Sequence, residues 1–163
     1  MITDPKQIRK WVEENSDYEA VTFVKKIHPD GTVDLMTGYE YNPEEYEADY
    51  PCGFKEDATL ENGHLPIKIG EVSKSQLRLL CKGLTSLEGL PASLGYLELH
   101  TKQLSSLEGL PASLWYLELS TPKLASLRGC PAEIDSLHIW EHNLASLEGL
   151  PTNITREFLL QYK

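Results

Sequence analysis

The sequence predicts an α/β repeat protein, a short solenoid of parallel strands with a small N-terminal α+β capping region. The first observation is a duplication, because SLEGLPASLGYLEL at 86–99 recurs as SLEGLPASLWYLEL at 106–119. The second is that the pattern continues at the same spacing, without insertion, to the end of the chain. A fixed period of this length is typical of a solenoid, in which each unit buries its apolar edge against its neighbours.

The N-terminal residues predict a helix followed by a hairpin. Asp4 is a favourable N-cap and Pro5 suits the first helical position, so we expect a helix over 5–15. Its apolar side chains share one face, which indicates that this face packs on a neighbouring element. Alternating apolar residues then predict antiparallel strands at 21–27 and 32–36, joined by a His-Pro-Asp-Gly turn.

An acidic, tyrosine-rich segment follows at 38–61, with eight acidic residues against one lysine. One interpretation is an ordered surface loop whose tyrosines pack back on the domain. The other is a docking segment for a basic surface, because tyrosine supplies contact area at little entropic cost. The candidate binding residues of this segment are Tyr41, Glu44, Glu45, Tyr46, Glu47 and Asp49.

The repeats divide core positions from surface positions. The copies at 84–103 and 104–123 differ at five positions, and none of these is a leucine, so the leucines are expected to form the core. We expect an N-terminal region over 1–60 and a repeat region over 61–163. The repeat region comprises a degenerate first repeat at 64–83, regular repeats at 84–103, 104–123 and 124–143, and a terminal repeat at 144–163.

Strands are expected at 96–100, 116–120 and 136–140. Side chains alternate across a strand, so the second and fourth residues of each would point inward and the other three outward. Three rows of outward side chains follow, and their glutamates would repel one another unless they faced a basic partner. The candidate partner-binding residues are Tyr96, Glu98, His100, Tyr116, Glu118, Ser120, Ser136, His138 and Trp140.

These leucine spacings, with the SLEG turn and the following proline, make 65–163 resemble leucine-rich repeat proteins in the short, twenty-residue form of their repeat. The similarity is greatest to repeats of bacterial effectors and of phage and giant-virus proteins. The resemblance implies parallel strands on a concave face, turns on a convex face, and a phage-encoded protein that binds and modulates or inhibits a host intracellular protein. The usual turn asparagine is replaced by Lys102, Pro122 and His142.

Composition excludes several other classes of function. The net charge of −10 opposes direct binding to nucleic acid, whose phosphates attract Lys and Arg. No long apolar run predicts a membrane span, and the start lacks the features of a secretory signal. Three scattered cysteines indicate neither a disulfide framework nor a zinc knuckle, so we expect a cytoplasmic protein, in the host cytoplasm if it is phage-encoded.

The sequence thus favours a non-catalytic protein-binding module. We expect no catalytic residue, no cofactor and no metal ligand, because the histidines are scattered and no phosphate-binding glycine loop is present. Its partner would carry a basic surface. Two alternatives remain open: an acidic mimic of nucleic acid that blocks a DNA- or RNA-binding enzyme, and a self-associating structural protein. A homodimer through the C-terminal edge strand is a further possibility, because unpaired strand edges invite pairing.

Overall fold

The N-terminal helix forms where its capping residues predict it. In the computed structural model, which describes residues 1–154, α1 spans Pro5–Asn15. The Asp4 carboxylate accepts a hydrogen bond from the Lys6 amide at 2.9 Å, as an N-cap residue does. Ile8, Trp11 and Val12 are buried on one face of the helix. The predicted helix over 5–15 is therefore confirmed.

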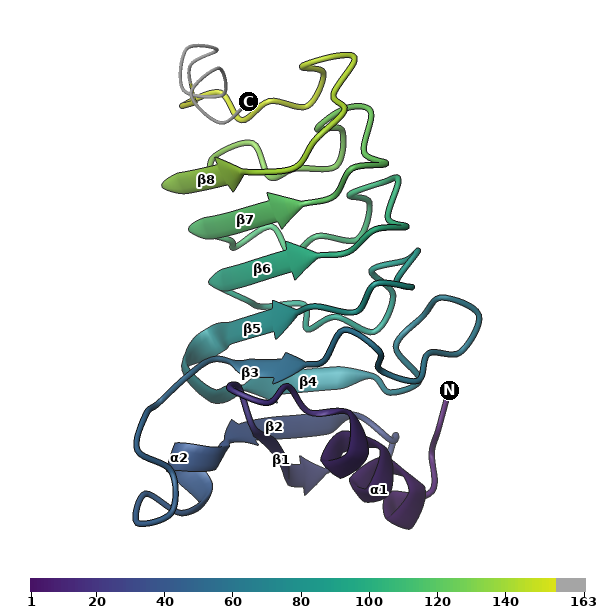
Figure 1. The fold of residues 1–163 in the computed structure, drawn as a ribbon, viewed down its shortest axis with the longest axis vertical. Helices are drawn as coiled ribbons and strands as arrows, with labels where there is room; N and C mark the ends of the chain where they lie inside the picture. The colour runs from purple at the N-terminus through teal and green to yellow at the C-terminus, as the bar shows by residue number, and fades with distance from the viewer. Residues whose placement is uncertain (155–163) are drawn as a thin grey trace.

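The hairpin is also confirmed and belongs to a three-stranded sheet. β1 (Thr22–Ile27) pairs antiparallel with β2 (Val33–Thr37), and β4 (Ile69–Val72) adds to β2 in parallel. The one-turn helix α2 (Gly38–Tyr41) follows β2 directly. This sheet and α1 form the lower end of the molecule in Figure 1.

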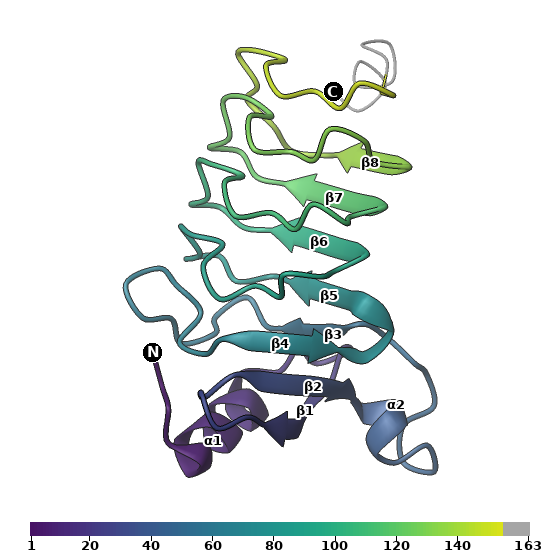
Figure 2. The same cartoon turned by 180° about the vertical axis from the view of Figure 1, so that it is seen from behind.

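A second sheet rises from this base and carries the repeats. Its order is β3-β5-β6-β7-β8, and each pair of neighbours is parallel. Each strand and its irregular return make one layer, so the protein is a small α/β protein with about three turns of a β-solenoid (Figures 1 and 2). The strands are β3 (Cys52–Phe54), β5 (Gln76–Leu79), β6 (Tyr96–His100), β7 (Tyr116–Ser120) and β8 (Ser136–Ile139), with a 3-10 turn, η1 (Ser73–Ser75), before β5.

The predicted leucine core is confirmed. Leu97, Leu117 and Leu137 stand opposite one another in the sheet register, and each is fully buried. They belong to one apolar cluster that also holds Ile8 of α1 and Leu35 of β2. The core is therefore continuous from the N-terminal region into the last described coil.

The SLEG serines hydrogen-bond within the turns, as their recurrence in every copy predicts. The hydroxyls of Ser86 and Ser106 accept a hydrogen bond from the amide two residues later at 3.1 Å, and the two later copies repeat this contact. The glycine that ends each SLEG or SLRG turn has a positive φ, +97° at Gly109 and +101° at Gly129. This backbone conformation favours glycine over residues with a Cβ.

Two expectations about strands need correction. The segment at 38–61 is not entirely a surface loop, because Cys52, Gly53 and Phe54 are buried and form the edge strand β3. β8 ends at Ile139, so Trp140 lies just beyond the predicted strand, although its amide still donates to the Leu119 carbonyl at 2.8 Å. The C-terminal edge strand considered for a homodimer falls at 155–163, outside the described residues.

Two buried threonines, Thr101 and Thr121, occupy the same repeat position directly after β6 and β7. Both are fully buried, and within residues 1–154 neither hydroxyl has a hydrogen-bond partner. Because an unsatisfied buried polar group costs about 1–3 kcal/mol, we expect Thr101→Val and Thr121→Val each to raise the free energy of unfolding by roughly 1 kcal/mol. Urea denaturation measures this change. Thr85→Val is the control without a gain, because Thr85 Oγ1 donates to the Gly63 carbonyl; losses in both test variants would contradict the prediction.

Candidate binding surface

The outward side chains of β5 to β8 form one surface, which we call the strand face. They alternate with buried aliphatic residues along each strand and are themselves half-buried. The alternation expected from strand geometry is thus confirmed. The strand face consists of Gln76, Arg78, Tyr96, Glu98, His100, Tyr116, Glu118, Ser120, Ser136 and His138.

The sheet register brings the predicted rows together. Tyr96 stands opposite Tyr116, and Tyr116 opposite Ser136. Glu98, Glu118 and His138 form the second row, and His100 stands opposite Ser120 in the third. The geometry of these rows is confirmed, whereas their role in binding a partner stays a prediction.

Tyr96 and Tyr116 are stacked and hydrogen-bonded to the glutamates of their own strands. Their rings are 4.4 Å apart at an interplanar angle of 7°. The Tyr116 hydroxyl donates to Glu118 Oε2 at 2.8 Å, and the Tyr96 hydroxyl donates to Glu98. Burial, and then the hydrogen bond to the neighbouring carboxylate, raise the pKa of both phenols. Each tyrosine therefore acts as a donor that fixes the adjacent carboxylate.

Arg78 extends the glutamate row by one coil and was missed by sequence reasoning. It stands opposite Glu98, and Arg78 Nε lies 3.2 Å from Glu98 Oε2. Its Nη1 lies 3.3 Å from Glu19 Oε2 and 3.6 Å from Asp17 Oδ2. Burial opposes the charged guanidinium, but the carboxylates outweigh this effect and raise its pKa. The repeat period could have identified Arg78 as part of this row, since it precedes Glu98 by one repeat length.

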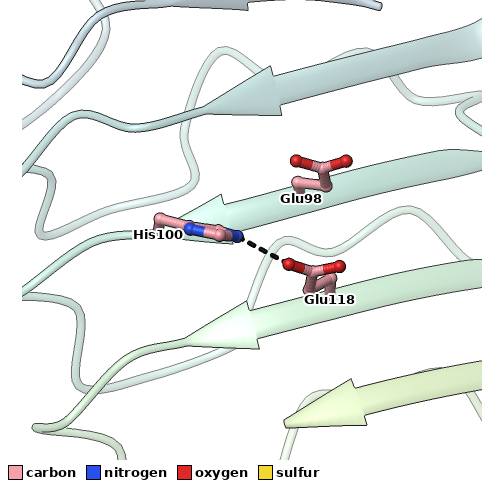
Figure 3. Close-up of side chains that lie close together, drawn as sticks. All are labelled: Glu98, His100 and Glu118. Carbon is pink, nitrogen blue, oxygen red and sulfur yellow. Dashed lines mark hydrogen bonds and ion pairs between the residues drawn. The ribbon is translucent and has the colours of Figure 1, made fainter. Parts of the chain in front are cut away.

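His100, the histidine at the end of β6, lies against Glu118 of the next strand. Figure 3 shows its ring reaching across to this carboxylate, with Nε2 2.9 Å from Glu118 Oε1. Glu98 lies beside them on β6. One donor atom from each of Glu98, His100 and Glu118 falls within 4.8 Å of the others, and no second cluster of three such ligands occurs in residues 1–154. The sequence did not predict this cluster.

The expected repulsion between the stacked glutamates is offset within the strand face. Glu98 is neutralised by Arg78, and Glu118 contacts His100 and Tyr116. Hydrogen bonds and ion pairs within the strand face thus satisfy these carboxylates without a partner. A basic partner is not needed to explain why the two glutamates are stacked.

Two exposed tryptophans flank the rows. Trp115 is 46% exposed, and its ring centroid lies 6.0 Å from that of Tyr96 and 6.1 Å from that of Tyr116. Its indole covers Gly95, where an added Cβ would collide with the ring. Trp140 is 49% exposed. Trp115 was not among the predicted site residues, although it is one of the five differences between the matched repeats.

The acidic segment packs partly against β1. The Tyr41 ring stacks on Phe23 with centroids 4.1 Å apart, and the Tyr46 ring meets the same phenylalanine edge-on at 5.9 Å. This contact agrees with the interpretation in which the tyrosines pack back on the domain. Of the other predicted residues of the segment, Glu44, Glu45 and Glu47 are exposed.

Asp49 lies apart from these acids, in a cleft of about 590 Å³ between α2, β4 and η1. It accepts a hydrogen bond from Thr37 Oγ1 at 3.0 Å and forms an ion pair with Lys74, which lowers the pKa of its carboxyl group. On the same cleft, Lys25 Nζ lies 2.9 Å from Glu40 Oε1. The charges of this cleft are thus largely satisfied by one another.

Comparisons with known proteins assign neither a family nor a function to this surface. No protein family matches the chain, and neither a curated protein nor a solved structure is similar to it. Within residues 1–154, no helix is long and apolar enough to cross a membrane. The three cysteines are free thiols, with Cys52 and Cys81 buried.

Proposed function

We propose that this chain is a protein-binding module of the leucine-rich-repeat type, and that the strand face with Trp115 and Trp140 contacts the partner. The observation that carries the proposal is the gathering of exposed aromatic area on one side of the sheet. Tyr96, Trp115 and Tyr116 contact one another there, and Trp140 follows the outward His138 by two residues. Tryptophan and tyrosine are the residues most enriched among the energetically dominant contacts of protein interfaces.

The surrounding polar groups support the same role. Side chains that are fixed before binding lose less conformational entropy when a complex forms. The contacts from Tyr96 and Tyr116 to Glu98 and Glu118 hold this part of the face in one arrangement. Repeat solenoids generally bind partners along an extended face, and this further supports the strand face as the binding surface.

The partner is a protein with a basic surface, in this proposal, because the net charge of −10 attracts such a surface at long range. The paired glutamates contribute less at short range than the aromatic residues. Resemblance to phage-type repeats favours a phage-encoded inhibitor of a host protein. Nucleic-acid mimicry has weaker support, because Glu40 and Asp49 of the acidic segment are paired with Lys25 and Lys74.

Site-specific photocrosslinking tests the proposed surface without removing an aromatic residue. A photoreactive amino acid is placed at Ser120 on the strand face and, as a matched control, at the exposed Ser105, which lies outside the strands. We expect the Ser120 probe to capture one host protein that the Ser105 probe does not capture. Mass spectrometry identifies the captured protein.

A second step tests whether the two tryptophans contribute to binding the captured protein. The double variant Trp115→Gly and Trp140→Ala should lose the crosslink, because interface tryptophans often contribute about 2 kcal/mol or more. Glycine is suitable at 115 because it occupies the equivalent position 95. Tyr18→Ala, which removes an aromatic residue that is 94% exposed elsewhere, should retain it. Equal capture at Ser105 would exclude the strand face as the contact, and retention of the crosslink in the double variant would exclude the two tryptophans as its main contacts.

A further inference from the structure

We propose that Glu98, His100 and Glu118 form a binding site for one divalent first-row transition metal ion, with Zn²⁺ as the best fit. The three side chains lie together on the strand face (Figure 3), and an ion bound by them would not require the proposed protein partner. One donor atom from each residue already lies within 4.8 Å of the other two.

The backbone places these donors together. Glu98 and His100 are two residues apart on β6 and therefore share a face, and Glu118 stands opposite Glu98 on β7. His100 Nε2 and Glu118 Oε1 are 2.9 Å apart. Nitrogen and oxygen ligands lie about 2.0–2.2 Å from zinc, so two of them on one tetrahedral ion are roughly 3.4 Å apart. A shift of about half an ångström would open this pair for an ion, and the Glu98 donor, which lies within 4.8 Å of the other two, would have to close to the same spacing.

The carboxylates are held as metal ligands usually are. Ligating groups in proteins are themselves hydrogen-bonded by neighbouring side chains, which fixes their orientation. Tyr116 donates to Glu118 Oε2 and leaves Oε1 on the side of His100, and Tyr96 donates to Glu98 Oε1. Arg78 contacts Glu98 Oε2. Two carboxylates and one guanidinium leave a net charge of −1, which still attracts a dication.

The donor set selects the kind of ion. Imidazole with carboxylate suits zinc and its neighbours, whereas calcium requires six to eight oxygen ligands. Three protein ligands leave a fourth position for water or for a group of another molecule. The side chains of Glu98, His100 and Glu118 are 15%, 34% and 18% exposed, so solvent reaches the cluster.

The cluster is not a by-product of repetition. The repeats at 84–103 and 104–123 are identical except at five positions, and His100 is one of these five. Ser120 takes its place in the next coil, so a second copy of the Glu-His-Glu arrangement is not created there. The histidine thus completes one site at one layer of the solenoid.

Calorimetric titration of the full chain with ZnCl₂ tests the proposal. We expect one ion per chain for the natural sequence. His100→Ser, which copies the residue at position 120, should weaken binding by at least about 10–100-fold, the loss seen for hydrogen-bond partners of metal ligands, and Glu118→Gln should act in the same direction. The control is His64→Ser, because His64 Nδ1 lies 3.0 Å from Glu88 Oε2, a similar pair outside the cluster of three.

Each outcome decides the proposal, provided that circular dichroism shows the variants folded. Unchanged affinity in His64→Ser with loss in both His100→Ser and Glu118→Gln supports it. Absence of zinc binding at millimolar concentration in the natural chain overturns it, as does an equal loss in the His64 control. Titration with MgCl₂ should give no comparable heat, and binding of Mg²⁺ as tight as that of Zn²⁺ would contradict the assigned ion class.

Discussion

Leu117→Ala is expected to lower the free energy of unfolding by about 2–5 kcal/mol, the range for buried leucines whose removal leaves a cavity. Leu117 is fully buried on β7, with Leu97 opposite on one side and Leu137 on the other. Because each coil contacts only its neighbours, the cavity would weaken both interfaces of this coil at once. Urea denaturation followed by circular dichroism measures the change.

Leu110→Ala is the matched control for this substitution. Leu110 belongs to the same repeat, but it is only partly buried and packs at the margin of the core. We expect a loss of about 1 kcal/mol, since less apolar surface is removed from the interior. Equal losses at 110 and 117 would contradict the view that the inward row of strand leucines holds the coils together.

Gly129→Ala is expected to lower the free energy of unfolding by roughly 2–5 kcal/mol, from backbone strain of about 1–2 kcal/mol and overpacking of about 1–3 kcal/mol. Gly129 has a φ of +101°, and an added Cβ would lie 2.7 Å from the Leu107 carbonyl carbon and 2.8 Å from the Glu108 nitrogen. Both are backbone atoms of the preceding coil. The coil could relieve this contact only by moving away from its neighbour.

Gly109→Ala separates the two contributions. Gly109 has nearly the same φ, +97°, and occupies the same repeat position, but its added Cβ would lie 3.4 Å from the Leu87 Cβ, at an ordinary contact distance. The free energy of unfolding of Gly109→Ala should therefore fall only by the cost of backbone strain, about 1–2 kcal/mol. Thermal and urea denaturation of both variants give the comparison. If Gly109→Ala lowers the free energy of unfolding as much as Gly129→Ala does, the clash does not contribute to the loss.

The regular part of the fold could be predicted because the repeat copies within the chain can be compared with one another. Positions that stay leucine in successive copies define the inward row, and the period fixes the register from Tyr96 to Tyr116. β3 could not be found in this way. Cys52 pairs with Leu77, which lies farther along the chain than one repeat length, so this strand falls outside the period and within an acidic segment.

The rows of the candidate site could be predicted, but their contacts could not. Alternation along a strand shows that His100 points outward, whereas its contact with Glu118 depends on side-chain torsions across two strands. Arg78 was accessible in principle, since the period predicts its position opposite Glu98. It was missed because the first coil keeps the leucine spacing while losing the other repeat residues.

The fit of Trp115 over Gly95 limits how this protein can grow by copying its own gene. A tandem copy of the unit at 84–103 would place glycine above glycine and leave room between layers. A tandem copy of the unit at 104–123 would place a Cβ where the indole of the next layer now lies, so that ring would have to take another position. Lengthening of the array by duplication of the first unit needs no such shift, whereas each junction between copies of the second unit needs one.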